Sequence, residues 1–591
     1  MSSVREVRVG LATCGIAAGA QRVADRLQEL RTAGRFDSAI KRVGCVGMCY
    51  NEPIVDLVDA SGEVTTYGNI GEVDVDRIVD EHVVGGHVVE DLCVSPEGFF
   101  RNQVRIVLEN CGVIDPESLE EYRTRDGYVA LETALREMSP EHVVELVKAS
   151  GLRGRGGAGF PTGLKWSFAA REDASEKYVI CNADEGDPGA FMDRSVLEGD
   201  PHRVLEGMAI AAYAIGASHG YVYVRAEYPL AIRRLEKALE DAHAAGLLGE
   251  KVLGSSFSFD VRIKAGAGAF VCGEETALIA SIEGRRGMPR RRPPYPANSG
   301  LWGKPTNINN VETLANVPWI LRNGAEAFSA YGTETSKGTK VFALAGRIRH
   351  SGLIEVPMGM SIREIVYDIG GGIQDDRPLK AVQTGGPSGG CIPAALADTP
   401  VDYEALKATG AIVGSGGMIV LDDSTCMVEM ARYFLDFTQK ESCGKCTFCR
   451  IGTRRMLETL ERICRGEGQP QDLDKLVDLG RKVKAYSLCG LGQTAPNPVL
   501  TTVEHFRDEY VAHIENHACP AKTCKPLIRF HIDPESCKNC GLCARGCPVE
   551  AIRAVEDGYH VIDEELCVKC GRCRQVCPFG AVGVLTGKGT S

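Results

Sequence analysis

The stretch GLRGRGGAGFPTGLKW, at residues 151–166, is the starting point for the fold of the central region. Glycine has no Cβ and lets backbone N–H groups approach a phosphate closely, and four of the six glycines in this stretch lie close together: Gly154, Gly156, Gly157 and Gly159. Arg155 and Lys165 add positive charge. A glycine-rich loop is also often only a turn. This one lacks the Ser or Thr of G-x-x-x-x-G-K-[ST], and it follows a helical pattern, whereas the dinucleotide fingerprint follows a strand.

Two downstream stretches predict an open α/β sheet around this loop. CNADEGDPG (181–189) follows a strand-like run and projects polar side chains from its carboxyl end, where ligands of such sheets bind: Asn182, Asp184, Glu185 and Asp187. GAGAFVCGEETALIASIEG (266–284) is a glycine-rich turn into a helix that bears Glu274 and Glu275. Acidic residues near a helix start are also simply partners of the helix dipole. Helical and strand patterns alternate over 136–335, so we expect an α/β domain there.

The C-terminal tail contains an internal repeat. CKNCGLCARGCPVEAI (537–552) returns as CVKCGRCRQVCPFGAV (567–582), and each copy has the spacing C-x2-C-x2-C-x3-C-P. In this spacing the fourth cysteine of each run ligates the cluster of the other run. Two zinc ribbons are the alternative, but ribbons use paired C-x2-C units. The tail predicts one [4Fe–4S] cluster on Cys537, Cys540, Cys543 and Cys577, and a second on Cys547, Cys567, Cys570 and Cys573.

A third cysteine run lies before the tail. ESCGKCTFCRIGT places Cys443, Cys446 and Cys449 at C-x2-C-x2-C spacing. Cys489 follows after two helical stretches, and a helical hairpin would return it to the run. These four residues predict a third [4Fe–4S] cluster, with a zinc site or unpaired thiols as the alternative.

A further constellation lies between these runs, in HIENHACPAKTC (513–524). Three cysteines and one histidine make a structural tetrahedral zinc site. We expect the ligands to be Cys464, Cys519, Cys524 and His513, with His517 as the other histidine candidate. Surface histidines and spare thiols are the alternative. The scattered cysteines are interpreted as small buried hydrophobic residues: Cys93, Cys111, Cys181, Cys272, Cys391 and Cys426.

Composition limits the classes of protein that this chain can be. Its 591 residues are enough for three to six domains at about 100–200 residues each. A net charge of -12 makes a general nucleic-acid surface unfavourable. No run approaches the ~18 apolar residues of a membrane helix, and MSSVREVRVGLATC lacks a signal-peptide pattern. The missing signal-peptide pattern favours the cytoplasm, or docking on a partner that holds the chain elsewhere. Because cytosolic thiols rarely form structural disulfides, the clustered ones among the 24 cysteines indicate metal ligation.

The glycine-rich loop, the segments at 181–189 and 266–284, and the cysteines at 443–489 together resemble one family. It is the flavin- and NADH-binding (51 kDa-type) subunit of respiratory complex I and its soluble relatives. The string PPYPANSGLWGKPTNINNVET (293–313) belongs to the same pattern, and the resemblance covers about 136–510.

The resemblance implies FMN in the glycine-rich site. Its phosphate side would be held by Gly154, Arg155, Gly156, Gly157 and Lys165. The rest would be lined by Asn182, Asp184, Glu185, Gly273, Glu274, Asn309 and Asn310. NADH would stack over the flavin, with Phe160 and Phe168 near the adenine, and with Glu275, Arg292 and Tyr295 shaping the remainder. The three aromatic residues could equally be core residues.

The chain departs from the respiratory pattern at three of these positions. Asp187 stands where Glu is usual, Phe270 where Tyr is usual, and Arg292 where Lys is typical. Arg292 follows Arg290 and Arg291, and such a cluster could accept a 2′-phosphate. NADP therefore stays open beside NAD.

The N-terminal segment resembles the thioredoxin-like [2Fe–2S] domain of another complex I subunit. Cys45 and Cys49 match its C-x3-C pair and Cys14 matches one cysteine of its first pair, but the second is missing. The fourth ligand is then a distant cysteine or another side chain; alternatively, the fold persists without a cluster. We expect a bound [2Fe–2S] cluster.

The predicted fold class is multidomain α/β and α+β. The expected domains are a thioredoxin-like [2Fe–2S] domain (1–90), a connector (91–135), a Rossmann-like FMN- and NAD(H)-binding domain (136–335), a β-grasp domain (336–425), a helical bundle with a [4Fe–4S] and a zinc site (426–525), and a ferredoxin-like tail with two [4Fe–4S] clusters (526–591).

This order resembles the diaphorase subunit of soluble multisubunit enzymes: electron-bifurcating [FeFe]-hydrogenases, NAD(P)-reducing hydrogenases, NAD-dependent formate dehydrogenases and bifurcating transhydrogenases. The implied function is hydride exchange between NAD(H) and FMN, followed by single-electron transfer through the clusters. The implied partners are a small [2Fe–2S] subunit, a catalytic iron–sulfur subunit such as a hydrogenase or formate dehydrogenase, and ferredoxin. Nucleic acid and direct membrane insertion are not expected. The rival hypotheses are a non-enzymatic electron-transfer scaffold and a complex I-type NADH:quinone oxidoreductase component.

Overall fold

The computed structural model describes residues 4–587 and divides into two compact units. The first contains the chain up to Arg377 together with Ala381–Val420, and the second contains Pro378–Lys380 and the chain from Leu421 onward. No helix within 4–587 combines the length and the apolar character needed to cross a membrane.

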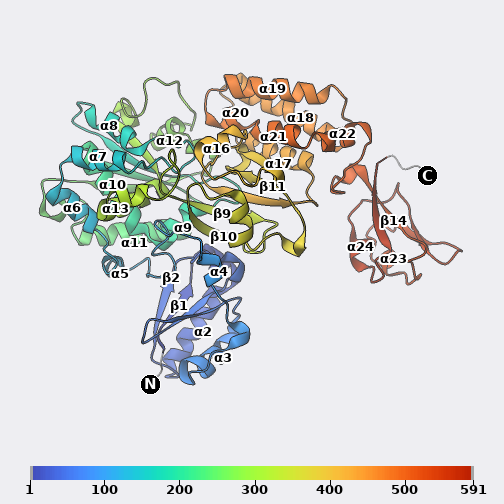
Figure 1. Cartoon of the computed structure of the whole chain (residues 1–591), viewed down its shortest axis with the longest axis horizontal. Coiled ribbons are helices and arrows are strands. Elements are labelled where there is room, and N and C mark those ends of the chain that lie inside the picture. The colour runs from blue at the N-terminus through green and yellow to red at the C-terminus, as the bar shows by residue number, and fades with distance from the viewer. Residues whose placement is uncertain (1–3, 588–591) are drawn as a thin grey trace. The chain divides into compact units, whose positions relative to one another are not determined.

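The first unit begins with a small α/β layer, drawn in blue in Figure 1. Its sheet has the order β2-β1-β3-β4, with β1 parallel to β2 and antiparallel to β3. The strands are β1 (Val4–Gly10), β2 (Ala39–Val43), β3 (Val55–Asp59) and β4 (Val64–Tyr67). Apolar residues of these strands form a core with two helices, α2 (Ala20–Thr32) and α3 (Glu72–Arg77). The short helix α1 (Thr13–Ala18) precedes α2.

A connector of short helices leads to the central domain. These helices are α4 (Glu97–Phe100), α5 (Leu119–Arg123) and α6 (Val129–Glu137). The central sheet is fully parallel in the order β7-β6-β5-β8. Its strands are β5 (Tyr178–Ala183), β6 (His219–Arg225), β7 (Asp260–Gly266) and β8 (Thr306–Asn310). A parallel sheet needs helices on its faces, and the predicted α/β alternation provides them.

The helix α10 (Pro201–Ile215) is buried on nearly all sides, because apolar residues surround it. It packs against α13 (Val311–Asn323), α6 and the sheet. The other helices of this domain are α7 (Pro140–Ala149), α8 (Thr162–Arg171), α9 (Met192–Gly199), α11 (Pro229–Ala244), α12 (Glu275–Ile282) and α14 (Ala325–Ser329). The helical pattern expected just before the glycine-rich loop corresponds to α7.

A second, mixed sheet follows in the order β10-β9-β13-β11-β12. Its strands are β9 (Thr339–Gly346), β10 (Gly352–Pro357), β11 (Leu379–Thr384), β12 (Gly390–Pro393) and β13 (Gly417–Asp422). Two short helices accompany it, α15 (Ile362–Glu364) and α16 (Tyr403–Ala408). The β-rich character predicted for 336–425 is therefore present, and the β-grasp assignment stays a prediction.

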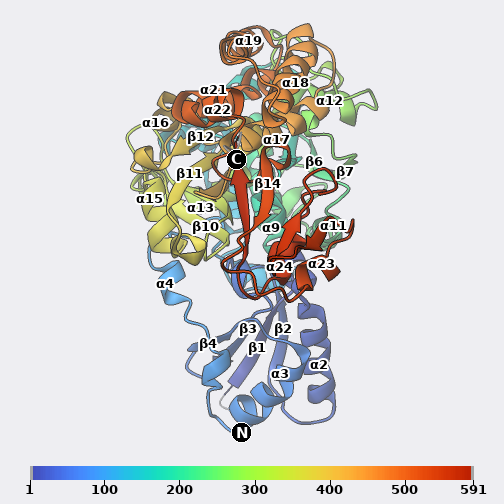
Figure 2. The ribbon, with the colours of Figure 1, turned by 90° about the vertical axis from the view of Figure 1, so that its right-hand side faces the viewer.

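The second unit combines a helical bundle and a cysteine-dense tail. The bundle helices are α17 (Met427–Lys440), α18 (Thr453–Cys464), α19 (Asp472–Tyr486), α20 (Gly490–Thr494), α21 (Asn497–His505) and α22 (Arg507–Glu515). The tail pairs β14 (Ile528–Ile532) with β17 (Val582–Thr586), and β15 (Ile552–Ala554) with β16 (His560–Ile562). Its two repeats each supply one short helix, α23 (Leu542–Arg545) and α24 (Arg572–Val576), which Figure 2 shows in red.

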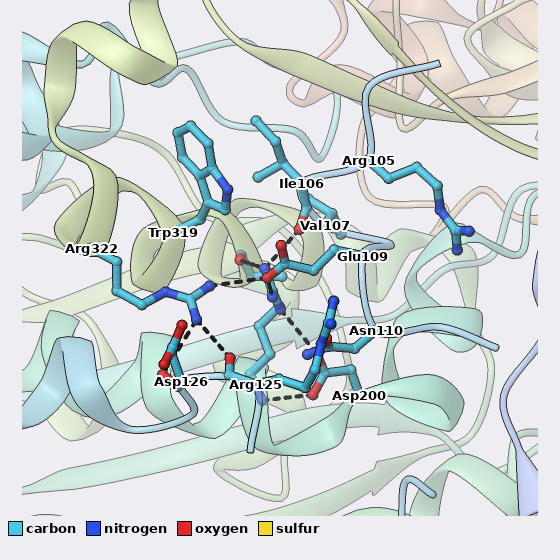
Figure 3. Close-up of polar contacts among 12 residues, drawn as sticks. Arg105, Ile106, Val107, Glu109, Asn110, Arg125, Asp126, Asp200, Trp319 and Arg322 are labelled. Carbon is cyan, nitrogen blue, oxygen red and sulfur yellow. Dashed lines mark hydrogen bonds and ion pairs between the residues drawn. The ribbon is translucent and has the colours of Figure 1, made fainter. Parts of the chain in front are cut away.

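A buried ionic network ties the connector to α10 and α13 (Figure 3). Arg203 is fully buried; its guanidinium pairs with Glu109 and Asp200 and donates to the carbonyl of Ile106 at 2.7 Å. Arg322 also pairs with Glu109, at 3.0 Å. Burial raises the pKa of Asp200 to about 7 and lowers that of Arg203 to about 9. The contacts offset this desolvation cost only while every partner is present.

We expect Arg203→Met to destabilise the first unit by about 3–5 kcal/mol, because the buried Asp200 and the partly buried Glu109 both lose a cationic partner. The measurement is urea unfolding followed by tryptophan fluorescence, since Trp166, Trp302 and Trp319 all lie in this unit. Arg123→Met is the control, because its partner Glu120 is exposed; it should change stability by less than about 0.5 kcal/mol. Equal unfolding midpoints for the two variants would contradict the role of the network.

Candidate functional site

Three segments meet at the carboxyl edge of the parallel sheet. Asn182 lies near the end of β5, Asn310 ends β8, and the loop after β7 leads to Gly273. The Asn182 side-chain amide donates to the carbonyl of Gly273 at 2.9 Å, which joins two of these segments. Ligands of open α/β sheets bind at this edge, so the segments predicted from sequence converge where a ligand site is expected.

The glycine-rich loop lies against this edge. A Cβ on Gly156 would come within 2.9 Å of the Asn310 Cβ, and a Cβ on Gly159 within 2.7 Å of the Tyr403 ring. Gly157 has a φ of 116° and forms a β-bridge with Gly414. A side chain at Gly156 would collide with Asn310 at the sheet edge, and side chains at Gly157 and Gly159 would crowd Gly414 and Tyr403 on the other side of the loop. The bridge to Gly414 therefore straps the loop in place, and its glycines let the backbone lie close to Asn310 at the sheet edge.

The two basic residues of the loop region have different environments. The Arg155 side chain is fully buried, and its guanidinium donates to the carbonyls of Thr339, Lys337 and Arg153 at 3.0, 2.6 and 3.0 Å. The prediction that this side chain holds a phosphate differs from the structure, because three backbone carbonyls already occupy its donors. Lys165 instead extends to the edge, where its ammonium pairs with Glu275 and donates to the carbonyl of Ile308 at 2.5 Å.

Several predicted site residues cap helices that begin at the same edge. Glu185 accepts from the N–H groups of Asp193 and Arg194 in the first turn of α9. Glu274 caps α12 and Asn310 caps α13. Asn309 accepts from the Trp166 indole at 2.8 Å, and Asp184 is buried beside Asn182. The helix-dipole interpretation of the acidic residues thus holds for Glu185 and Glu274, whose carboxylates also fix the shape of the edge.

Asp187 is partly buried and accepts a hydrogen bond from Ser415 at 2.5 Å. Burial raises the pKa of Asp187 to about 6, and the Ser415 hydroxyl lowers it in part. A carboxyl group with a pKa raised in this way favours the folded state below its unfolded pKa, and this contribution is lost as the pH rises through about 6.

The aromatic residues predicted near a nucleotide are exposed rather than packed in the core. The side chains of Phe160, Phe168 and Tyr295 are 45%, 41% and 54% exposed. The rings of Phe160 and Phe168 are 6.5 Å apart. Phe270 is partly exposed and Arg292 is exposed, with its guanidinium 3.8 Å from Glu275. The core-residue alternative is therefore excluded for Phe160, Phe168 and Tyr295.

Each of two small cavities in the tail is lined by four cysteines. One is lined by Cys537, Cys540, Cys543 and Cys577. The other is lined by Cys547, Cys567, Cys570 and Cys573. These are the two crossed sets that the repeat spacing predicts. In the bundle, Cys489 begins α20, next to the π-helical turn Phe448–Gly452 that carries Cys449. Burial raises the pKa of Cys449, and Cys446, Cys489 and Cys443 lie near enough to raise it further, so the four predicted ligands lie in one neighbourhood.

Three thiols of the N-terminal domain also converge. The sulfurs of Cys14, Cys45 and Cys49 all lie within 4.8 Å of one another. Hydrogen bonds with Cys45 and Cys49 lower the pKa of Cys14 to about 3, so a thiolate is favoured there. The carboxylate of Glu52 lies 3.9 Å from the Cys14 sulfur, and burial followed by the Cys14 charge raises the pKa of Glu52 to about 8.

A four-residue group in the bundle differs from the predicted zinc set at one position. The ligand atoms of Cys426, His513, Cys519 and Cys524 lie within 4.8 Å of one another, and all four residues are buried. Cys464 instead groups with Cys524 and Glu429, and His517 lies outside both groups. Cys426 was expected to be a buried hydrophobic residue. It enters the group because it caps the start of α17, which packs against α22 and its His513.

The histidine of this group is oriented by a backbone contact. His513 Nδ1 lies 2.7 Å from the carbonyl of Glu509, and Nε2 faces the sulfurs of Cys426 and Cys524 at 3.4 and 3.3 Å. Metal-binding histidines use such a contact to present the other nitrogen. Hydrogen bonds with Cys426 and then Cys524 hold the pKa of Cys519 far below its usual value. Three thiols and an oriented imidazole suit Zn²⁺.

Comparison with known proteins identifies the family. A model described as the Nuo51 FMN-binding domain matches residues 147–319, one for the NADH-ubiquinone oxidoreductase-F iron-sulfur binding region matches 429–513, and one for a 4Fe-4S dicluster domain matches 529–581. The chain is 59% identical over 460 residues to "NADP-reducing hydrogenase subunit HndC" of Solidesulfovibrio fructosivorans, covering 78% of this chain and 94% of that protein. The chain belongs to the family of complex I 51 kDa subunits.

Other relatives agree with this assignment. An NADH-quinone oxidoreductase subunit of Rhizobium meliloti is 49% identical over 415 residues, covering 70% of this chain and 99% of that protein. A solved NAD+-reducing [NiFe]-hydrogenase in the H2-reduced state matches with a TM-score of 0.62 and 31% identity, covering 86% of this chain and 84% of that chain. The predicted family is confirmed, and the chain is an oxidoreductase of the NAD(P)H-dependent type.

We expect Asp187→Asn to gain stability relative to the wild type as the pH rises from 5 to 7.5. With a folded pKa of about 6 and an unfolded pKa of 3.8, the wild type loses about 1.4 kcal/mol over this range and the amide loses nothing. Urea unfolding by tryptophan fluorescence at each pH measures the difference. Ser415→Ala should move the wild-type loss to higher pH, because it removes the bond that lowers the Asp187 pKa. Parallel pH profiles for wild type and Asp187→Asn would contradict this assignment.

Proposed function

We propose that this chain is the diaphorase subunit of a soluble multisubunit oxidoreductase. It exchanges hydride between NAD(H) and FMN and passes single electrons through iron–sulfur clusters to or from a partner. The observation that carries the proposal is the strapped glycine loop at the carboxyl edge of the parallel sheet, with exposed Phe160 and Phe168 beside it. The family model over 147–319 supports the flavin.

The residues at the edge fit an FMN phosphate. The backbone of Gly156 and Gly157 is open toward it, and Lys165 supplies a cation at the same edge. A phosphate there would compete with Glu275 for the Lys165 ammonium, so Glu275 is free to turn toward a second ligand. Arg155 would not contact the phosphate; its guanidinium holds the loop to the start of β9 by donating to the carbonyls of Thr339 and Lys337. The remaining predicted residues (Asn182, Asp184, Glu185, Gly273, Glu274, Asn309 and Asn310) position the loops that surround a flavin ring.

FMN supplies the conversion between a two-electron hydride and single electrons. The chain supplies alignment and exclusion of water. Phe160 and Phe168 provide an apolar surface for an adenine, since bases stack on aromatic rings. Arg292, whose guanidinium lies 3.8 Å from Glu275, and the exposed Tyr295 three residues later are the further contacts proposed for the nucleotide.

The nucleotide is NAD(H) in this proposal, with NADP(H) as the second candidate. Arg290 is committed to structure, because its guanidinium donates to the carbonyls of Pro294 and Ser299. Arg291 and Arg292 are exposed and could contact a 2′-phosphate. The relative HndC carries an NADP-reducing name, which keeps this candidate open.

The cluster content proposed is three [4Fe–4S], one [2Fe–2S] and one structural zinc. The cysteine-lined cavities support the tail clusters, and the convergent thiols at Cys14, Cys45 and Cys49 support the [2Fe–2S] cluster. The zinc ligands proposed are Cys426, His513, Cys519 and Cys524. This site would join the start of α17, α22 and the segment before the tail.

The proposed partners are a small [2Fe–2S] subunit and a catalytic iron–sulfur subunit such as a hydrogenase or formate dehydrogenase, with ferredoxin as a further partner. The hydrogenase names of relatives support the first choice. A more specific form of the proposal is that the flavin of this chain is the site of electron bifurcation. We propose a cytoplasmic location, because thiol ligands persist in a reducing compartment.

The proposal predicts that the purified chain is reduced by NADH under anaerobic conditions, with bleaching of the flavin absorbance. In Phe160→Ala/Phe168→Ala we expect the KM for NADH to rise about 5- to 160-fold, because lost base stacking costs about 1–3 kcal/mol. FMN content should stay unchanged.

Trp302→Ala is the matched control for an exposed aromatic side chain. It packs against Tyr178 at the amino end of β5, away from the carboxyl edge, so the KM for NADH should not change. Full FMN without bleaching by either NADH or NADPH would favour an electron-transfer scaffold instead.

We expect Cys426→Ser to lose about one zinc per chain and Cys464→Ser to retain it, because only Cys426 groups with His513. Metal analysis of the full-length protein measures this. The opposite result, zinc lost only in Cys464→Ser, would restore the ligand set predicted from sequence. Equal zinc in both variants would contradict the site.

A further inference from the structure

The three thiols of the N-terminal domain leave one position of a [2Fe–2S] cluster to be filled. Two other cysteines occur in residues 4–135. Cys93 is exposed and forms a backbone bridge with Tyr67. Cys111 is buried, and its sulfur lies against Gly199 of α9. Within the described chain, neither joins the group formed by Cys14, Cys45 and Cys49.

A carboxylate lies beside these thiols. Glu52 follows Cys49 by three residues, at the end of the turn Cys49–Asn51, and is 8% exposed. Its Oε1 is 3.9 Å from the Cys14 sulfur, and its Oε2 accepts from the N–H of Ile54 at 3.1 Å. One oxygen is thus fixed by the backbone while the other faces the thiols.

Two glycines make room for this carboxylate. A Cβ on Gly15 would lie 3.0 Å from Oε2, and a Cβ on Gly10 would lie 3.4 Å from it. A Gly15 Cβ would also lie 2.3 Å from the carbonyl oxygen of Gly10, so glycine is required there by the backbone as well, whereas the Gly10 distance is an ordinary van der Waals contact. The loop that contains Gly10 and Gly15 therefore packs closely against the Glu52 carboxylate.

No cationic side chain among residues 4–587 forms an ion pair with Glu52, whose polar partners there are a thiol and one backbone N–H. Buried carboxylates are normally paired with a cation or bound to a metal. Three thiols that converge on the same place supply the rest of a metal site. The arrangement is hard to explain by folding stability alone.

The loop that presents Cys14 is held by the central domain. Thr13 donates its backbone N–H to Glu198 at 2.8 Å and its hydroxyl at 2.5 Å. Arg234 donates to the carbonyl of Leu11 at 2.9 Å. Glu198 is almost fully buried at the end of α9, so these contacts fix the distance between Cys14 and Glu52.

We propose that Glu52 is the fourth ligand of the [2Fe–2S] cluster, binding iron through Oε1 beside the thiolates of Cys14, Cys45 and Cys49. This inference rests on the proposed [2Fe–2S] cluster. Ligation forms one Fe–O bond, and the carboxyl and thiol protons pass to solvent with no change in oxidation state. Carboxylate oxygen is an established type of ligand for non-haem iron. A carboxylate also keeps the ligand charge equal to that of four thiolates.

The test uses the full-length protein, with anaerobic iron analysis, EPR of the reduced state and resonance Raman spectra. Cys45→Ser sets the baseline for loss of the cluster. We expect Glu52→Ala to lose roughly the same two irons per chain as Cys45→Ser. We expect Glu52→Cys to keep them, with shifted g values and altered Fe–S stretching bands. Asp56→Asn is the matched control, because Asp56 is a carboxylate on β3 that bonds to Thr66 instead; it should match the wild type.

The outcomes separate the ligand from the cluster. Equal iron in the wild type and Cys45→Ser would overturn the cluster itself, and Glu52 with it. A cluster that depends on Cys45 but keeps its iron and spectra in Glu52→Ala would overturn only Glu52. Loss of two irons in Cys111→Ser would assign the fourth position to Cys111 and also overturn the proposal. If Glu52→Ala does not fold, Glu52→Cys decides: an unshifted spectrum would count against ligation.

Discussion

The carboxyl edge of the central parallel sheet is the constraint on which the flavin domain depends. Three helices, α9, α12 and α13, begin there, and their first N–H groups are capped by Glu185, Glu274 and Asn310. Capping satisfies donors that would otherwise be lost on burial. It also fixes the positions of three loops within a few ångströms of one another. The glycine-rich strap can then lie against Asn310 without a side chain between them.

The same residues therefore have two roles. Side chains that cap helices stabilise the fold, and because the helices start at the sheet edge, they also shape the ligand site. This explains why the acidic segments admitted two interpretations from sequence. A helix cap and a ligand-lining residue are alternatives only where the helix begins away from the site.

Cysteine thiols have a comparable double role in the other domains, where the same side chains pack in the core and form the candidate metal sites. The tail has a small core, in which cysteines are packed among a few apolar residues. In such a domain metal binding contributes to folding, because the ligands converge only in the folded chain. The group of Cys426, His513, Cys519 and Cys524 has the same character: it links residues nearly a hundred positions apart in sequence. The N-terminal thiols depend in turn on contacts from α9, through Glu198 and Thr13.

The sequence by itself determined the features that depend on short spacing: the crossed cysteine sets of the tail, the α/β alternation, the glycine strap and the family. Each is set by residues close together in the chain, or by a periodic pattern that the backbone must follow. Tertiary structure decided three matters that spacing cannot express. Arg155 turned inward because carbonyls of a distant strand accept its donors. Cys426 joined His513 because α17 packs against α22. Glu52 came to face Cys14 because two strands of one sheet bring the ends of their loops together, and long-range packing, not local sequence, places such side chains.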